Sequence, residues 1–130
     1  MMDTTPYELL GGEAGLRKLT HTFYDVMDRL PEAKEVRDMH DGNLDSIKER
    51  LFEYLSGWLG GPQLFRERHG SVCITSQHKK FSIGPAERDQ WLMCMDVALD
   101  EVGASAETKA MLKEPIYRLA DFLRSDKQRA

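Results

Sequence analysis

Helix-breaking residues divide this chain into segments, and within each segment apolar side chains recur every three or four residues. The clearest case is the stretch 13–30, which Pro31 ends. Apolar residues at this spacing form a single stripe along one side of an α-helix, and that stripe needs a partner to cover it. In the stretch 13–30 the stripe consists of Leu16, Leu19, Phe23, Met27 and Leu30.

The remaining segments are bounded by recognisable start and stop signals. Thr5-Pro6-Tyr7-Glu8 is a capping box with proline at the first helical position. Asn43 is a suitable cap for a helix over 43–59, and Ser105 for one over 105–124 in which Pro115 predicts a kink or a division. A helix over 85–102 opens at Gly84-Pro85. With no strand pattern or internal repeat, the sequence predicts an all-α fold with four principal helices.

Composition limits the class of protein. A chain of 130 residues predicts one domain, 1–130, with an N-terminal segment of about 1–6 and a polar tail of about 125–130. The formal charge of −4 excludes a broad basic surface for nucleic acid. The longest apolar run, 91–95, is far shorter than the ~20 residues that span a bilayer, so no membrane association is expected. Two cysteines and no export signal predict a cytoplasmic protein.

Few residues offer chemistry on their own. His69, Cys73 and His78 are spaced loosely like metal ligands, but a structural zinc site normally needs a fourth ligand, and none is evident. The glycine pairs follow no strand, so they break helices and do not cradle phosphate. No nucleophile motif is present.

Three polar-tipped aromatic residues fall at or near inward-facing positions: Tyr24, His40 and Trp91. In a core, such side chains need hydrogen-bond partners, which a bound polar ligand would supply. His78 lies in a polar run and is followed at once by Phe81 and Ile83. A histidine there is by itself most often a surface residue.

In their order along the chain, several motifs resemble the second group of the truncated haemoglobins. They are Gly11-Gly12 after a very short first helix, Phe23-Tyr24, Trp58-Leu59-Gly60-Gly61-Pro62, His78 with Phe81 and Ile83, and Glu87-Arg88-Asp89-Gln90-Trp91-Leu92-Met93-Cys94-Met95. The resemblance runs from Tyr7 to about Leu123, and the tryptophan favours the second group over the first. It implies a two-over-two helical sandwich around a haem, with 13–30 and 43–59 as one pair and 85–102 and 105–124 as the other.

The resemblance also implies roles for single residues around a haem b group. His78 matches the proximal iron ligand, which makes it the metal-binding residue. Tyr24 and Trp91 match distal residues whose O–H and N–H donate hydrogen bonds to a bound ligand. His40 falls near a position at the pocket wall that carries tyrosine, phenylalanine or histidine in this group. Packing on the apolar sides of their helices is the alternative for Tyr24 and Trp91, and a surface position for His40.

Further residues match the lining of the haem site. Ile47 matches the gate position and cannot donate a hydrogen bond, and Arg50 is a candidate partner for a haem propionate. The remaining candidate haem contacts are Leu51, Phe65, Phe81, Ile83 and Trp91. The chain departs from the group at Gly70-Ser71-Val72-Cys73-Ile74-Thr75, where a basic residue is usual. We expect Cys94, one helical turn after Trp91, to pack in the core.

The function that follows is the binding of oxygen, nitric oxide and carbon monoxide, with redox chemistry on nitric oxide or peroxide. Activity of a nitric oxide dioxygenase or a peroxidase would need an unidentified reductase, and the protein would be a monomer or a homodimer. Ligand storage or sensing without turnover is one alternative, and a haem-free helical interaction module is another. The sequence leaves open whether Tyr24 or His40 binds iron in the resting state.

Overall fold

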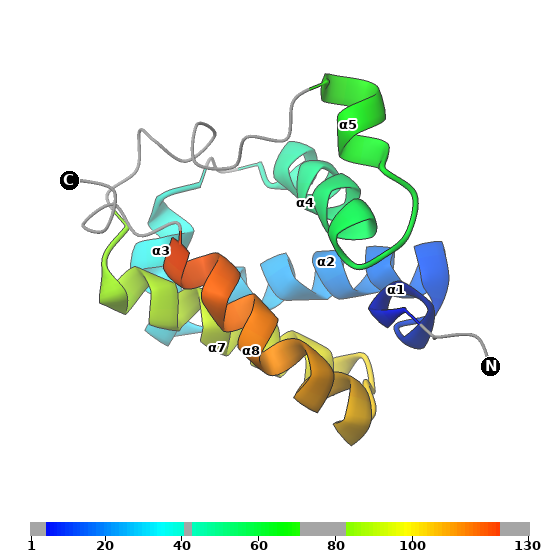
Figure 1. Ribbon diagram of the computed structural model, residues 1–130. Coiled ribbons are helices and arrows are strands. Elements are labelled where there is room, and N and C mark those ends of the chain that lie inside the picture. The colour runs from blue at the N-terminus through cyan, green and yellow to red at the C-terminus, as the bar shows by residue number, and fades with distance from the viewer. Residues whose placement is uncertain (1–4, 41–42, 71–82, 123–130) are drawn as a thin grey trace.

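The structure is a computed structural model that describes residues 5–40, 43–70 and 83–122. Every regular element in these ranges is a helix (Figure 1). The longest are α2 (Gly12–Arg29), α4 (Asp45–Trp58), α7 (Pro85–Glu101) and α8 (Ala106–Phe122). Shorter ones are α1 (Pro6–Leu9), the 3-10 helix η1 (Pro31–Ala33), α3 (Lys34–Asp38) and α5 (Leu64–His69). The predicted all-α fold class is confirmed.

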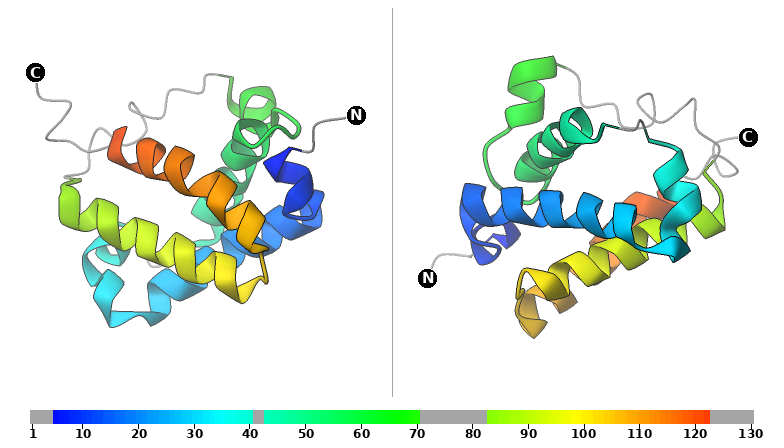
Figure 2. Two further views of the ribbon diagram at one scale, coloured as in Figure 1. Left: turned by 60° about the horizontal axis from the view of Figure 1, so that its bottom comes forward. Right: turned by 180° about the vertical axis from the view of Figure 1, so that it is seen from behind.

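Helix α2 lies at the centre of the molecule, with α4 packed on one side and α7 on the other (Figure 2). Helix α8 packs along α7, and α1 contacts both α2 and α8. Two helix pairs, α2 with α4 and α7 with α8, therefore lie one over the other, as the sequence predicts. The short helix α3 lies against α7, and α5 lies against α4.

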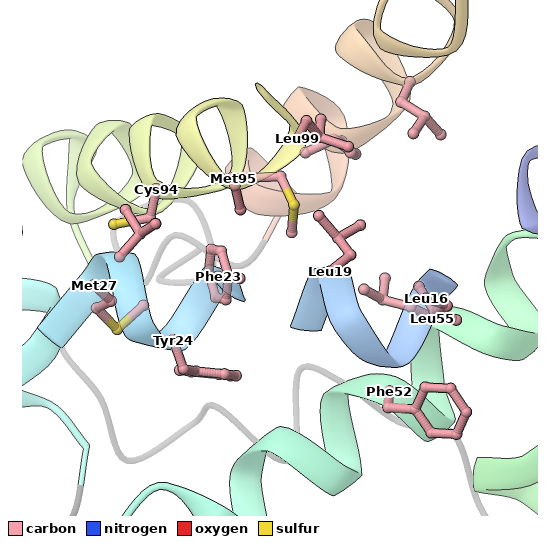
Figure 3. Close-up of a cluster of buried hydrophobic side chains, with 14 of the residues drawn as sticks. Leu16, Leu19, Phe23, Tyr24, Met27, Phe52, Leu55, Cys94, Met95 and Leu99 are labelled. Carbon is pink, nitrogen blue, oxygen red and sulfur yellow. The ribbon is translucent and has the colours of Figure 1, made fainter. Parts of the chain in front are cut away.

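The core is centred on α2, because this helix is covered on two sides. Phe23 is fully buried, and Met27 is almost so. Figure 3 shows the α2 side chains facing Met95 and Leu99 of α7 on one side, and Phe52 and Leu55 of α4 on the other. Burial of each large apolar side chain contributes roughly 1.5–3 kcal/mol, so α2 fixes the position of both its neighbours.

Helix ends agree with the predicted signals in most places. The capping box at Thr5 forms, with the Thr5 hydroxyl accepting from the Glu8 N–H at 3.1 Å. The cap of α4 is Leu44, one position after the predicted cap Asn43. The Asn43 side chain still accepts a hydrogen bond from the Asp45 N–H at 2.9 Å. Pro115 does not divide α8, which runs through it. The proline lies on the exposed side of α8, where water can satisfy the carbonyl that it deprives of a donor.

The corner between α1 and α2 depends on glycine. Gly11 and Gly12 have φ values of 102° and 68°, which side chains rarely tolerate. Gly15, one turn into α2, approaches the preceding segment so closely that a Cβ atom there would lie 1.7 Å from the Leu10 carbonyl oxygen. Because the Leu10 carbonyl oxygen is a backbone atom, it cannot rotate away from a Cβ atom as the end of a side chain could.

Gly15→Ala should therefore destabilise the protein by about 2–3 kcal/mol, in the range of core overpacking. Gly57→Ala in α4 is the matched control. Its Cβ would meet the side-chain oxygen of Gln63, 2.6 Å away, which can swing aside. Its cost should be about 1 kcal/mol or less. Chemical denaturation measures both, and equal losses in the two variants would contradict the close approach at Leu10.

Candidate functional site

The buried ring of Phe23 brings two of the predicted site residues together. Tyr24 follows it in α2, and the two ring centroids lie 4.9 Å apart at an interplanar angle of 77°. Trp91 comes from α7, with its ring centroid 5.0 Å from that of Phe23 at 62°. These are edge-to-face contacts, the geometry that aromatic pairs prefer. Tyr24 and Trp91 are thus placed beside one common ring.

His40 joins this group from the segment after α3. Its ring centroid lies 5.6 Å from that of Tyr24, again edge to face, at 72°. Its Nδ1 lies 2.8 Å from the Val36 carbonyl oxygen. A carbonyl oxygen can only accept, so Nδ1 carries the proton that is donated. The structure therefore brings Tyr24, His40 and Trp91 into one cluster.

The hydroxyl of Tyr24 stands out in this cluster. The residue is 3% exposed, yet its hydroxyl has no hydrogen-bond partner among the residues that the structure describes. No fully buried side-chain nitrogen or oxygen in those residues lacks a partner, so this hydroxyl must border open space. Burial raises the pKa of Tyr24 well above its ordinary value. It is a neutral donor at physiological pH.

Helix α4 provides an apolar wall. Ile47 and Leu51 pack against the core but remain partly exposed, and so do others along the same helix. Phe65 of α5 is partly buried and meets Tyr54 of α4, with ring centroids 6.2 Å apart. Arg50 is exposed on α4. The apolar side chains that share this partial burial are the cap residue Leu44 and, within α4, Ile47, Leu51, Tyr54 and Trp58.

The remaining predicted site residues are placed less fully. Ile83 lies just before α7 and is partly buried. His78 and Phe81 lie outside the described residues, as does Cys73. The predicted packing of Cys94 is confirmed, since its thiol is free and completely buried in α7.

A buried carboxylate that the sequence did not single out holds α5 against α4. Glu53 of α4 is 4% exposed, and its carboxylate oxygens lie 2.6 Å from Arg68 Nη1 and 2.7 Å from His69 Nε2. Burial alone would raise the pKa of Glu53, but the hydrogen bonds from these two residues hold it below its ordinary value. The carboxylate thus anchors α5 just before the segment 71–82. Because all three residues look like surface charges in the sequence, no local spacing points to this contact.

Two other features do not form a competing site. The residues that the structure describes contain no cluster of three or more potential metal ligands. The described part of the chain also has a cavity of about 250 Å³, but it lies between the α1–α2 corner and the α7–α8 turn, beside Leu10, Lys18 and Val102. It is lined by none of the described candidate site residues.

Comparisons with known proteins identify the class. The family described as bacterial-like globin matches residues 5–125. The solved group II 2-on-2 haemoglobin of Agrobacterium tumefaciens is 40% identical, with a TM-score of 0.89 over 95% of this chain and 96% of that one. A truncated haemoglobin of Pseudoalteromonas haloplanktis is 42% identical, with a TM-score of 0.88 over 93% and 98%. The group 2 truncated haemoglobin YjbI of Bacillus subtilis is 34% identical over 107 residues, 82% of this chain and 78% of that protein.

The chain therefore belongs to the bacterial-like globin family, and within it to the group II truncated haemoglobins. The two-over-two arrangement predicted from the sequence is the fold of this group. As a member, the protein is a haem globin that binds diatomic ligands. None of the helices in the described ranges is long and apolar enough to cross a membrane.

The described residues fit a haem. A flat, mostly apolar macrocycle needs apolar surface that the protein itself leaves uncovered, and the partly exposed stripe of α4 supplies it. The Tyr24 hydroxyl supplies a neutral donor that borders open space and has no partner in the described part of the chain. Exposed Arg50, on the same helix, can meet a carboxylate.

The burial of Tyr24 predicts a pH effect on stability. Because the pKa is raised in the folded state, folding is favoured while the phenol is neutral, and stability falls once the pH exceeds the pKa of the unfolded chain, ~10. Above that pH, the free energy of unfolding should decrease more steeply in the wild type than in Tyr24→Phe, with the difference approaching about 1.4 kcal/mol per pH unit. Denaturant titrations from pH 7 to 11.5 measure this. Near pH 7 the difference between the two proteins should not depend on pH, and parallel curves at high pH would contradict the buried phenol.

Proposed function

We propose that this globin binds oxygen tightly, releases it slowly and holds it for a redox reaction with nitric oxide or peroxide. One observation carries the proposal. Tyr24 and Trp91 contact the same buried ring, and neither the hydroxyl nor the indole N–H has a hydrogen-bond partner among the described residues. Two neutral donors are thus available beside one buried ring, with His40 next to Tyr24.

The residues that would hold a haem b group come from several elements. We assign His78 as the protein's iron ligand, and Ile47, at the gate, contributes no hydrogen bond of its own. Arg50 would pair with a propionate, an exposed contact that contributes only ~0–1 kcal/mol. When bound, the haem supplies an iron centre at which diatomic ligands bind and electrons are exchanged. The apolar contacts assigned to the protein are Leu51, Phe65, Phe81, Ile83 and Trp91.

The hydrogen-bond donors determine the rate at which a ligand dissociates. Hydrogen bonds from Tyr24 and Trp91 would stabilise a diatomic ligand that carries partial negative charge better than an apolar pocket would. A net hydrogen bond of ~1–1.5 kcal/mol slows ligand release about tenfold. Two such donors suit retention and reaction better than oxygen delivery.

Replacing each donor tests this mechanism. Tyr24→Phe and Trp91→Phe should each speed oxygen dissociation about tenfold, measured by stopped-flow displacement with carbon monoxide. Tyr117→Phe, on the exposed side of α8 and outside the apolar stripe of α4, is the matched control and should keep the wild-type rate. Unchanged rates in both donor variants would refute a donor-controlled pocket.

The assignment of His78 as the iron ligand has its own test. The purified protein should show a Soret band, and His78→Ala should lose the ferrous spectrum typical of imidazole ligation while remaining folded by circular dichroism. Spectra of the ferric, ferrous and carbon monoxide forms also show whether Tyr24 or His40 binds iron at rest. An unchanged ferrous spectrum in His78→Ala would refute the assignment of this ligand.

Measuring turnover distinguishes an enzyme from a protein that only stores or senses its ligand. With a supplied reductase, the oxygenated protein should consume nitric oxide, or the ferric protein should consume peroxide, over many cycles. A single stoichiometric reaction would favour storage or sensing. We place the protein in the cytoplasm as a monomer or homodimer, where a cellular reductase would return the iron to the ferrous state.

A further inference from the structure

The residue before Trp91 connects α7 to the segment that carries His40. Gln90 Oε1 accepts a hydrogen bond from the Val36 N–H at 3.1 Å, and Gln90 Nε2 donates to Glu35 Oε2, also at 3.1 Å. Val36 and Glu35 belong to α3, which packs against α7. One side chain therefore bonds two successive residues of the short helix.

The orientation of this amide is determined by its partners. An N–H can only donate, and a carboxylate can only accept. Turning the amide over would place its NH₂ group against the Val36 N–H and its oxygen against the Glu35 carboxylate, so that both contacts became repulsive. The Val36 N–H also belongs to the first turn of α3, where backbone donors lack partners within the helix. Gln90 supplies the missing acceptor.

The same residue of α3 orients His40. The Val36 carbonyl oxygen accepts from His40 Nδ1 at 2.8 Å, while the Val36 N–H is held by Gln90. Val36 itself is 5% exposed, so neither of its backbone groups can readily exchange its partner for water. A continuous path of hydrogen bonds runs from the α7 residue next to Trp91, through Val36, to the ring that contacts Tyr24.

We propose that Gln90 is a positioning residue of the ligand pocket, which fixes the ring orientation and tautomer of His40 through Val36. With Nδ1–H donating to the Val36 carbonyl oxygen, the ring is held in one orientation, and the donors that we assign to the pocket remain Tyr24 and Trp91. This rests on the proposed role of His40 in the pocket wall. Because Gln90 and Trp91 are adjacent on α7, one helix sets the positions of both the tryptophan and the histidine.

The test uses haem-loaded protein and Gln90→Met, which keeps the length of the side chain but makes no hydrogen bonds. Nitrogen-15 NMR of the ferrous carbon monoxide form reports the tautomer of His40, and amide exchange reports the Val36 hydrogen bond. In Gln90→Met, we expect a mixture of tautomers at His40 and at least tenfold faster exchange at Val36. Gln63→Met is the matched control, since Gln63 bonds the Gly57 carbonyl oxygen elsewhere, and should change neither.

Oxygen release shows whether Gln90 acts through His40. Gln90→Met should change the dissociation rate at least threefold, and adding it to His40→Leu should change the rate no further than His40→Leu alone. Additive effects, or His40 ring signals that do not respond to Gln90→Met, would overturn the positioning role. If His40→Leu leaves oxygen release unchanged while the ring signals respond to Gln90→Met, positioning stands and the pocket role of His40 fails.

Exchanging the charged and uncharged side chains at positions 90 and 35 distinguishes a positioning role of Gln90 from a general loss of packing. Gln90→Glu keeps an acceptor for the Val36 N–H but faces the Glu35 carboxylate, and should disturb the His40 signals. Combining Q90E with E35Q removes that repulsion and should restore the wild-type tautomer. This pair also decides the question if Gln90→Met does not fold, since failure to restore the tautomer would contradict the proposal.

Discussion

The packing of α2 between α4 and α7 is the constraint on which this structure depends. Phe23 is completely buried where α2 meets α7, and its ring touches both Tyr24 and Trp91. The two aromatic donors belong to different helix pairs, so only the crossing of those pairs brings them together. Without that crossing, Tyr24 and Trp91 would be unrelated residues on separate helices.

Much of the fold could be predicted because its elements are defined locally. Apolar spacing revealed the long helices, and glycine, proline and the capping box at Thr5 revealed most of their ends. Residue-based reasoning also placed Tyr24, His40 and Trp91 at inward positions, but only the family resemblance assigned them to one pocket. Their contacts join segments far apart in the chain, and periodicity carries no information about such pairs.

The interactions that adjust the site could not be predicted for the same reason. Gln90 falls within a recognised motif, but its partners lie 54 and 55 positions earlier in the chain. Glu53 looks like one more charge on a solvated helix until α5 folds back onto α4. The contacts of Gln90 and those of Glu53 also differ in their chemistry. Hydrogen bonds made by the uncharged amide of Gln90 fix the α3 side of the site, whereas a nearly buried carboxylate held by Arg68 and His69 fixes the α5 side.

The burial of Cys94 has a consequence for a protein that handles reactive gases. This sulfur lies one turn beyond Trp91 on α7 and, in Figure 3, faces Met27 across the core. Burial raises the pKa of the Cys94 thiol to about 11, so at neutral pH only about one molecule in 10⁴ carries the thiolate. Since the thiolate is the form that oxidants attack, the burial of Cys94 makes this sulfur a poor target for oxidation.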